Sequence, residues 1–118
     1  MNEGQALIGF GAMSQETRLR IVRLLVKAGP NGMAAGEIGE AVQVSPSNAS
    51  FHLKELERAG LIAARRESRS IVYSADYEAL SGLIRFLMED CCSGRPEICE
   101  PALAPACCAP KPVAGSVQ

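Results

Sequence analysis

Residues 44–62 read VSPSNASFHLKELERAGLI, and this stretch decides the fold. Ser45 is a favourable helix N-cap, and the proline after it costs no hydrogen bond because the first helical N–H lacks an intrahelical partner. Gly60 supplies the stop that glycine commonly gives after a helix. The stretch therefore predicts a helix over residues 45–59 with one buried apolar face. That face consists of Ala49, Leu53 and Leu56.

Shorter helices are predicted on the N-terminal side of this stretch. Residues 35–42 read as a short helix, which a turn separates from the longer one. Residues 14–28 begin at the N-cap signal Ser14 and precede a Gly-Pro pair, so we expect a helix there as well. Residues 5–12 are expected to form a first helix, which its glycines weaken.

Two short strands and a last helix are predicted after the longer helix. Residues 61–66 and 70–75 have the alternating, β-branched character of paired strands, with a hairpin tip at residues 67–69. A helix then begins at Asp76 and carries an apolar stripe, which is either core or a contact with a second copy of the chain. The stripe consists of Leu80, Leu83, Ile84, Leu87 and Met88. The predicted fold class is mainly α with a β-hairpin wing, which is a winged helix-turn-helix.

In this arrangement the longer helix enters the major groove of DNA. Asparagine pairs bidentately with adenine and phenylalanine packs on a thymine methyl group, whereas lysine and arginine contact phosphates. We therefore expect double-stranded DNA as a partner. The expected DNA-binding residues are Ser47, Asn48, Ser50, Phe51, His52, Lys54, Arg65, Arg66 and Arg69. The alternatives are a structural role for His52 and solvated charge for the three hairpin arginines.

The distribution of charge is more informative than the net charge of −1. Residues 14–28 hold four basic side chains and one acidic side chain, which gives a charge of +3. Residues 45–70 hold five basic and three acidic side chains, which gives a charge of +2. Residues 71–92 hold one basic side chain against four acidic, or −3. A basic middle and an acidic end can form a polarised molecule with one face suited to phosphates, or they can be ordinary solvated charges.

The sequence carries signals of neither a secretory leader nor a membrane span. Residues 6–13 are apolar, but they are few, interrupted by glycine and not preceded by basic residues. No run approaches the roughly 20 apolar residues that a span needs. We therefore expect a cytoplasmic protein without a membrane partner, in which thiols stay reduced. Its five cysteines then indicate metal, metalloid or redox chemistry before structural disulfides.

The stretch quoted first resembles the recognition-helix signature of the ArsR/SmtB family of metal- and metalloid-responsive repressors. Residues 16–21, ETRLRI, are similar to the family's second-helix motif, and residues 65–67 and 72–73 resemble its wing. The resemblance covers about residues 5–92. It implies a homodimer, built from the first and last helices, that binds an inverted-repeat operator and is released by an inducer. The residues expected at the dimer contact are Leu7, Ile8, Leu83, Leu87 and Met88.

The cysteines depart from the family's arsenic and cadmium site, a Cys-x-Cys in the helix before the recognition helix, because residues 34–44 hold no cysteine. A zinc-type site is disfavoured because the chain has one histidine. Soft thiolates select soft ions, and trivalent arsenic or antimony favours three of them in a pyramid. Some family members carry a Cys-Cys pair and a nearby cysteine at the end of the last helix and respond to arsenite. The resemblance therefore implies an inducer site at Cys91, Cys92 and Cys99.

These observations predict a repressor that responds to As(III) or Sb(III) and has no organic cofactor. Its domain is expected over residues 1–92, and residues 93–118 are expected to form a flexible Pro/Ala/Cys-rich tail in which Cys107 and Cys108 have no assigned role. The alternatives are the same repressor sensing cadmium, lead, an organoarsenical or an oxidant. A thiol enzyme such as an arsenate reductase is a remote alternative, because the chain lacks a Cys-x-x-Cys motif and a histidine near the thiols. We therefore expect that the chain is not an enzyme.

Overall fold

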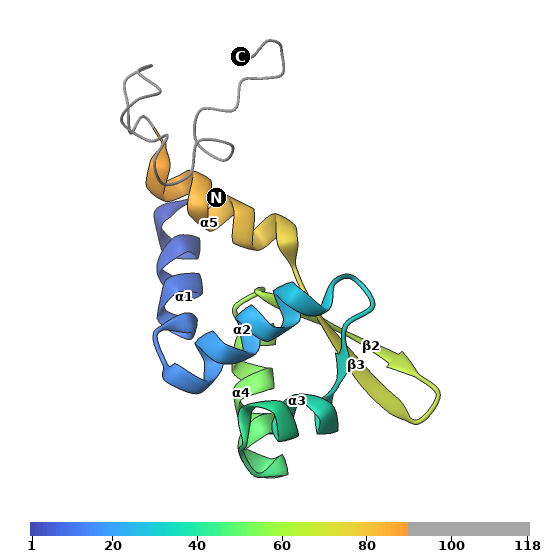
Figure 1. Cartoon of the computed structure of the whole chain (residues 1–118). Coiled ribbons are helices and arrows are strands. Elements are labelled where there is room, and N and C mark those ends of the chain that lie inside the picture. Colours follow the sequence, from blue (N-terminus) through green and yellow to red (C-terminus); the bar gives the residue numbers. More distant parts are fainter. Residues whose placement is uncertain (90–118) are drawn as a thin grey trace.

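Helices pack together around the base of a small antiparallel sheet, whose hairpin projects to one side, in the part of the chain that the computed structural model describes, residues 1–89 (Figure 1). The elements in chain order are α1 (Glu3–Met13), α2 (Glu16–Ala28), β1 (Met33–Ala34), α3 (Ala35–Val42), α4 (Pro46–Arg58), β2 (Ile62–Glu67), β3 (Ser70–Ala75) and α5 (Tyr77–Met88). This order confirms the predicted winged helix-turn-helix. No helix within residues 1–89 is long and apolar enough to cross a membrane.

The helix predicted from residues 44–62 forms as α4, with both of its end signals in place. The Ser45 hydroxyl accepts a hydrogen bond from the Asn48 backbone N–H at 3.2 Å, and Pro46 occupies the first turn. Gly60 follows the helix with a φ of +82°, a conformation that glycine adopts without strain. The buried face consists, as predicted, of Ala49, Leu53 and Leu56.

The start of α2 differs from the prediction. Ser14, the predicted N-cap, instead closes α1, where its hydroxyl donates to the Gly11 carbonyl oxygen at 3.3 Å. Gln15 caps α2 in its place, because its side-chain oxygen accepts from the Arg18 backbone N–H at 2.9 Å. Only these two residues separate the helices, and since the first of them ends α1, the second must begin α2.

The hairpin gains a third strand that the sequence analysis missed. β1 pairs antiparallel with β3, so the order of strands in the sheet is β1-β3-β2. β2 lies one residue later than predicted, because Glu67 still pairs with Ser70 and the turn uses only Ser68 and Arg69. Ser68 takes a φ of +55°, which suits the tight turn of a two-residue hairpin.

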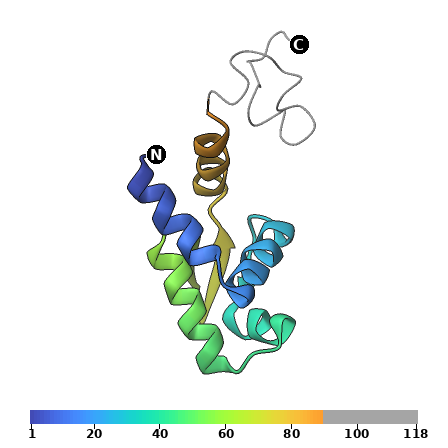
Figure 2. The same cartoon turned by 90° about the vertical axis from the view of Figure 1, so that its left-hand side faces the viewer.

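The core lies where α2 packs against α3, α4 and the sheet. Figure 2 shows α5 at the end of the molecule opposite α3, with α1 beside it. Ile38 of α3 and Leu83 of α5 belong to the same continuous apolar cluster, so the core joins the two ends of the molecule. The largest fully buried side chains in residues 1–89 are Ile21, Leu25, Ile38, Leu53, Leu56, Leu61 and Leu83.

Leu83 belongs to this core rather than to an outer surface. Only 2% of it is exposed, and a Cβ added to Gly9 would come within 3.0 Å of its methyl groups. The close approach of α1 to α5 at Gly9 thus covers Leu83 within one protomer. Leu83 therefore has almost no surface with which to make the expected contact with a second copy of the chain.

Replacing Gly32 by alanine is expected to lower the free energy of unfolding by about 1–3 kcal/mol. Gly32 has a φ of +74°, and a Cβ there would clash with the Tyr73 carbonyl oxygen where β1 meets β3. Denaturation in urea measures the change. Gly36→Ala is the control, because this helical position has open space around it and alanine there is expected to stabilise by about 0.5–1 kcal/mol. Equal effects of the two substitutions would contradict the assignment of Gly32 as a required turn residue.

Candidate nucleic-acid interface

The outward face of α4 carries most of the side chains expected to read DNA. Ser47, Asn48, Ser50 and Lys54 are exposed, and so is Phe51, with 54% of its surface accessible. They are exposed because the apolar positions between them turn toward α2 and α3. The structure therefore gathers five of the six predicted α4 residues on one accessible surface.

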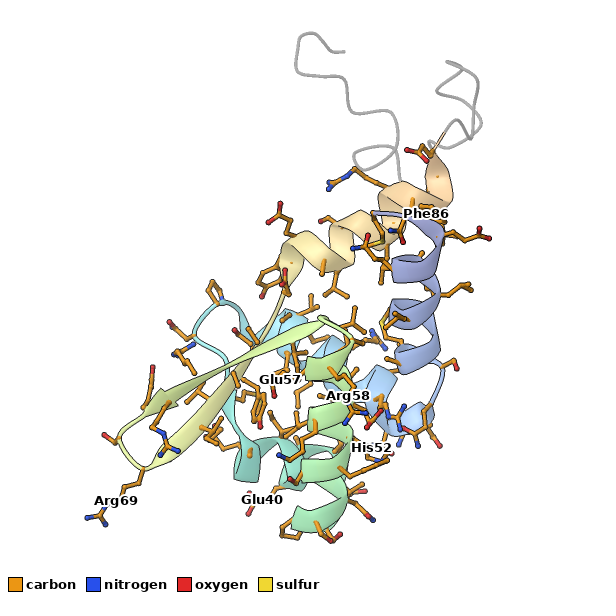
Figure 3. All side chains as sticks on the ribbon, turned by 180° about the vertical axis from the view of Figure 1, so that it is seen from behind. Glu40, His52, Glu57, Arg58, Arg69 and Phe86 are labelled. Atoms are coloured by element: carbon orange, nitrogen blue, oxygen red, sulfur yellow. The ribbon has the colours of Figure 1, made fainter. Side chains whose placement is uncertain are left out.

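His52 is the sixth, and it is half-buried toward α2 (Figure 3). Its Nδ1 atom accepts a hydrogen bond from Arg18 Nε at 3.1 Å. The Arg18 guanidinium carbon also lies 5.6 Å from the centroid of the Phe51 ring. The Phe51 and His52 rings meet edge to face, with their centroids 5.4 Å apart. Burial lowers the pKa of His52, and the positive charge of Arg18 lowers it further.

Arg18 contacts two of the predicted site residues, and the sequence analysis did not identify it. It lies in the first turn of α2, 34 positions before His52, and nothing local indicates a contact over that separation. The contact follows from the packing of α2 against α4, which only the folded chain shows. We refer to Arg18, Phe51 and His52 together as the Arg18 cluster.

The three hairpin arginines are not equivalent. Arg65 Nη2 donates to the Asn31 carbonyl oxygen at 2.7 Å, and Arg65 Nε lies 2.6 Å from a carboxylate oxygen of Glu67. Arg65 therefore ties the hairpin to the turn before β1. Arg66 and Arg69 are exposed and form no ion pair within residues 1–89, and Figure 3 shows Arg69 at the tip of the hairpin, pointing away from the body.

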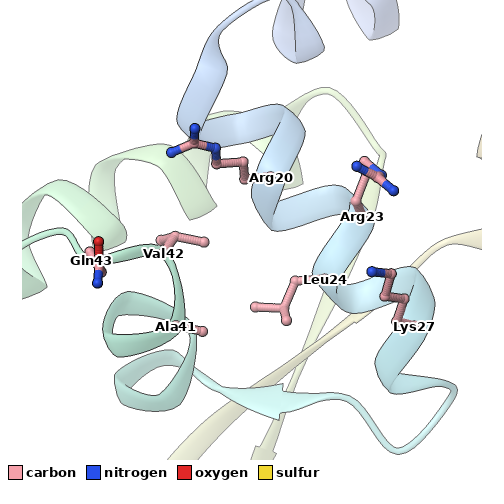
Figure 4. Close-up of a pocket in the computed structure, with 7 residues that line it drawn as sticks. All are labelled: Arg20, Arg23, Leu24, Lys27, Ala41, Val42 and Gln43. Atoms are coloured by element: carbon pink, nitrogen blue, oxygen red, sulfur yellow. The ribbon is translucent and has the colours of Figure 1, made fainter.

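Three basic residues of α2 line a groove of about 360 Å³ against the end of α3 (Figure 4). These residues are Arg20, Arg23 and Lys27, and Leu24, Ala41, Val42 and Gln43 complete the lining. Basic side chains are favourable beside the C-terminal end of a helix, where the last carbonyl groups carry partial negative charge. Three of the four basic side chains of residues 14–28 thus line this groove.

The outer surfaces of α1 and α5 are apolar. Leu7, Ile8 and Leu87 are 65%, 59% and 62% exposed, which is unusual for large aliphatic side chains on two neighbouring helices. Met88 is half-buried at the end of α5. Four of the five residues predicted for a dimer contact are therefore at least partly accessible, and Leu83 is the one that is not.

The proposed inducer ligands lie outside the described residues. Cys91, Cys92 and Cys99 follow residue 89, as do Cys107 and Cys108, the predicted domain end at residue 92 and the predicted tail. Within residues 1–89 no group of three or more His, Cys, Asp or Glu side chains is arranged to hold a metal ion. The three-cysteine site stays a prediction from the sequence.

Comparison with known proteins agrees with the fold and the arrangement of α3 and α4. A family model described as a helix-turn-helix domain matches residues 13–65. The chain is 35% identical to the HTH-type transcriptional regulator YgaV of Escherichia coli K12 over 88 residues, which are 75% of this chain and 87% of that protein.

Two solved structures are also similar. An ArsR-like transcriptional regulator from Rhodococcus sp. RHA1 matches with a TM-score of 0.63 and 28% identity, over 71% of this chain and 76% of that one. The homodimeric winged helix-turn-helix DNA-binding domain of a possible ArsR-family regulator from Mycobacterium bovis matches with a TM-score of 0.59 and 25% identity, over 78% and 85% of the two chains. The fold, the exposed face of α4 and these matches agree, and the chain belongs to the ArsR/SmtB family of winged helix-turn-helix transcriptional regulators and is not an enzyme.

Proposed function

We propose that this chain is a homodimeric repressor that binds operator DNA and releases it when As(III) or Sb(III) binds cysteine thiolates. The observation that carries the DNA-binding part is the exposed polar face of α4, beside a hairpin whose Arg66 and Arg69 project into solvent. Membership of the family supports a role in regulating transcription. Repression rather than activation, and As(III) or Sb(III) as the inducer, are what we propose.

In the proposed complex α4 lies in the major groove. Asn48 lies in its first turn, where recognition helices contact base edges, and its amide can pair with adenine. Phe51 is exposed one turn later and can pack against a thymine methyl group. Lys54, Arg66 and Arg69 would contact phosphates, which set the position of the helix without reading sequence. Arg65 would contribute less, because its donors already have protein acceptors.

The proposed dimer joins the apolar outer surfaces of α1 and α5. Leu7, Ile8 and Leu87 would be covered there, and the homodimeric structure from Mycobacterium bovis supports the assembly by similarity. A two-fold axis would present two copies of α4 to successive turns of the major groove, about 34–36 Å apart. This geometry fits an inverted-repeat operator.

The inducer site is proposed at Cys91, Cys92 and Cys99. α5 ends at Met88, so the first of these cysteines follows it by three positions. A metalloid that draws three thiolates together would act beside the α1–α5 surface and alter the spacing of the two α4 helices. Typical coupling between two sites is about 1–3 kcal/mol, which would weaken operator binding about 5- to 150-fold. Cadmium, lead, organoarsenicals and oxidants are alternative signals, since thiolates also respond to these.

Substituting the two projecting hairpin arginines is expected to reduce the salt dependence of operator binding. Each lost phosphate contact lowers the slope of log K against log salt by about 0.9. The double variant Arg66→Gln/Arg69→Gln, which removes four arginines per dimer, should therefore lower the slope by about 2–4. Fluorescence anisotropy with labelled operator at several salt concentrations measures it. The control is Arg23→Gln/Lys27→Gln, in the groove of Figure 4, for which we expect a slope close to that of the wild type.

The assignment of phosphate contacts to the hairpin would be contradicted if Arg23→Gln/Lys27→Gln lowered the slope and Arg66→Gln/Arg69→Gln did not. That result would move the phosphate contacts to α2.

Stoichiometric arsenite is expected to release the wild-type protein from its operator, and Cys91→Ser is expected to abolish this release while leaving operator affinity unchanged. The reason is that two thiolates hold As(III) much less tightly than three. Anisotropy titrations with arsenite, methylarsenite, cadmium and zinc under reducing conditions measure it, with Cys107→Ser as the control that should respond like the wild type. Release of Cys91→Ser at the wild-type arsenite concentration would refute the site, and release by cadmium or peroxide alone would favour the alternative signals.

A further inference from the structure

The Arg18 cluster joins the first turn of α2 to the middle of α4. Arg18 is itself held in place, because its backbone N–H is bound by the Gln15 cap. Its side chain then reaches His52 Nδ1 at 3.1 Å and places its guanidinium carbon 5.6 Å from the centre of the Phe51 ring. The exposed Phe51 and the half-buried His52 are thus both contacted by one residue of another helix.

The hydrogen bond between Arg18 and His52 determines which nitrogen of the His52 ring carries the proton. Arg18 Nε carries one hydrogen and can only donate, so His52 Nδ1 must offer a lone pair. In a neutral imidazole with Nδ1 as the acceptor, the proton resides on Nε2. The lowered pKa of His52 agrees with a neutral ring at pH 7.

The second ring nitrogen is accessible. No hydrogen bond of His52 Nε2 occurs within residues 1–89, and no buried side-chain nitrogen or oxygen in these residues lacks a partner. Nε2 is therefore an unpaired atom in contact with solvent. It lies on a helix whose neighbouring residues, Phe51 and Asn48, are exposed.

We propose that Arg18 is a positioning residue for DNA recognition, which holds His52 as a neutral Nε2–H donor aimed at a hydrogen-bond acceptor of the operator. The acceptor is either a guanine edge in the major groove or a phosphate oxygen, both of which accept one N–H. The same side chain orients Phe51 by the contact of its charge with the ring face. This inference rests on the proposed binding of DNA by α4, but the state of the ring can be tested without DNA.

The first test uses the only histidine in the chain. Nitrogen-15 spectra of histidine-labelled protein, recorded without DNA above the pKa of His52, report which ring nitrogen carries the proton. We expect the Nε2–H form to dominate in the wild type and in the control Arg58→Met, whose arginine pairs with Glu55 instead. In Arg18→Met we expect a mixture of both forms. A wild-type ring protonated on Nδ1, or one indistinguishable from that of Arg18→Met, would overturn the proposal, and the wild-type result needs no variant to fold.

The second test measures operator affinity. His52→Leu is expected to weaken binding about three- to tenfold, the size of one neutral hydrogen bond. Arg18→Met is expected to weaken the same hydrogen bond by a smaller factor, because part of the rings still carry the proton on Nε2. Their combination should cost less than the two separate losses together, because without the His52 ring Arg18 can act only through Phe51. His52→Gln should retain binding, since its amide N–H can replace Nε2–H. Additive losses in the double variant would overturn the proposal.

Operators with single base-pair changes identify the acceptor. If His52→Leu loses discrimination at one base pair, the acceptor is a base edge, and if it loses affinity equally on all operators, the acceptor is a phosphate. Either result supports the proposal that Arg18 positions His52 as a hydrogen-bond donor to the operator. If the wild type bound no operator at all, the proposed function would fail, while the ring spectra would still decide the role of Arg18.

Discussion

The candidate DNA-binding surface depends on one packing contact, that of α2 against α4. Ile21 and Leu25 of α2 share a core with Leu53 and Leu56 of α4. Burying one such side chain contributes about 1.5–3 kcal/mol, whereas a helix cap such as Ser45 contributes about 1 kcal/mol. The cap and Pro46 therefore decide where α4 begins, but apolar burial decides which way it faces. A helix that buries Leu53 and Leu56 has to present its opposite face to solvent.

Three of the basic residues differ in the protein acceptors that the fold places near them. Arg18 is brought against His52 and Phe51, where it orients groups that stay accessible. Arg65 is brought against the carbonyl oxygens of the turn before β1 and is held there. Arg69 meets no acceptor within residues 1–89 and projects from the hairpin tip. Positive charge alone therefore does not identify a phosphate contact, and the nearby protein acceptors have to be known.

Local signals were sufficient for most of the fold, because they act within one element. The pair Ser45-Pro46 and Gly60 gave the bounds of α4, and the predicted helix over residues 35–42 matches α3. Predictions were wrong or incomplete where distant segments decide. Ser14 closes α1 because two helices share a two-residue connection, β1 exists only because β3 pairs with it, and Leu83 is covered by α1 at Gly9. Arg18 was missed for the same reason, and the cysteines proposed to bind the inducer lie beyond residue 89.

Whether the outward face of α4 reads the operator can be measured by selecting bound sequences from a random DNA pool. Wild-type protein and Asn48→Ala are compared, because Asn48 is exposed in the first turn and its side chain does not cap the helix. If α4 reads the bases, Asn48→Ala should lose the preference for one base pair in each half-site, at a cost of about 1–3 kcal/mol, and keep the half-site spacing. Identical preferences for the two proteins would contradict it.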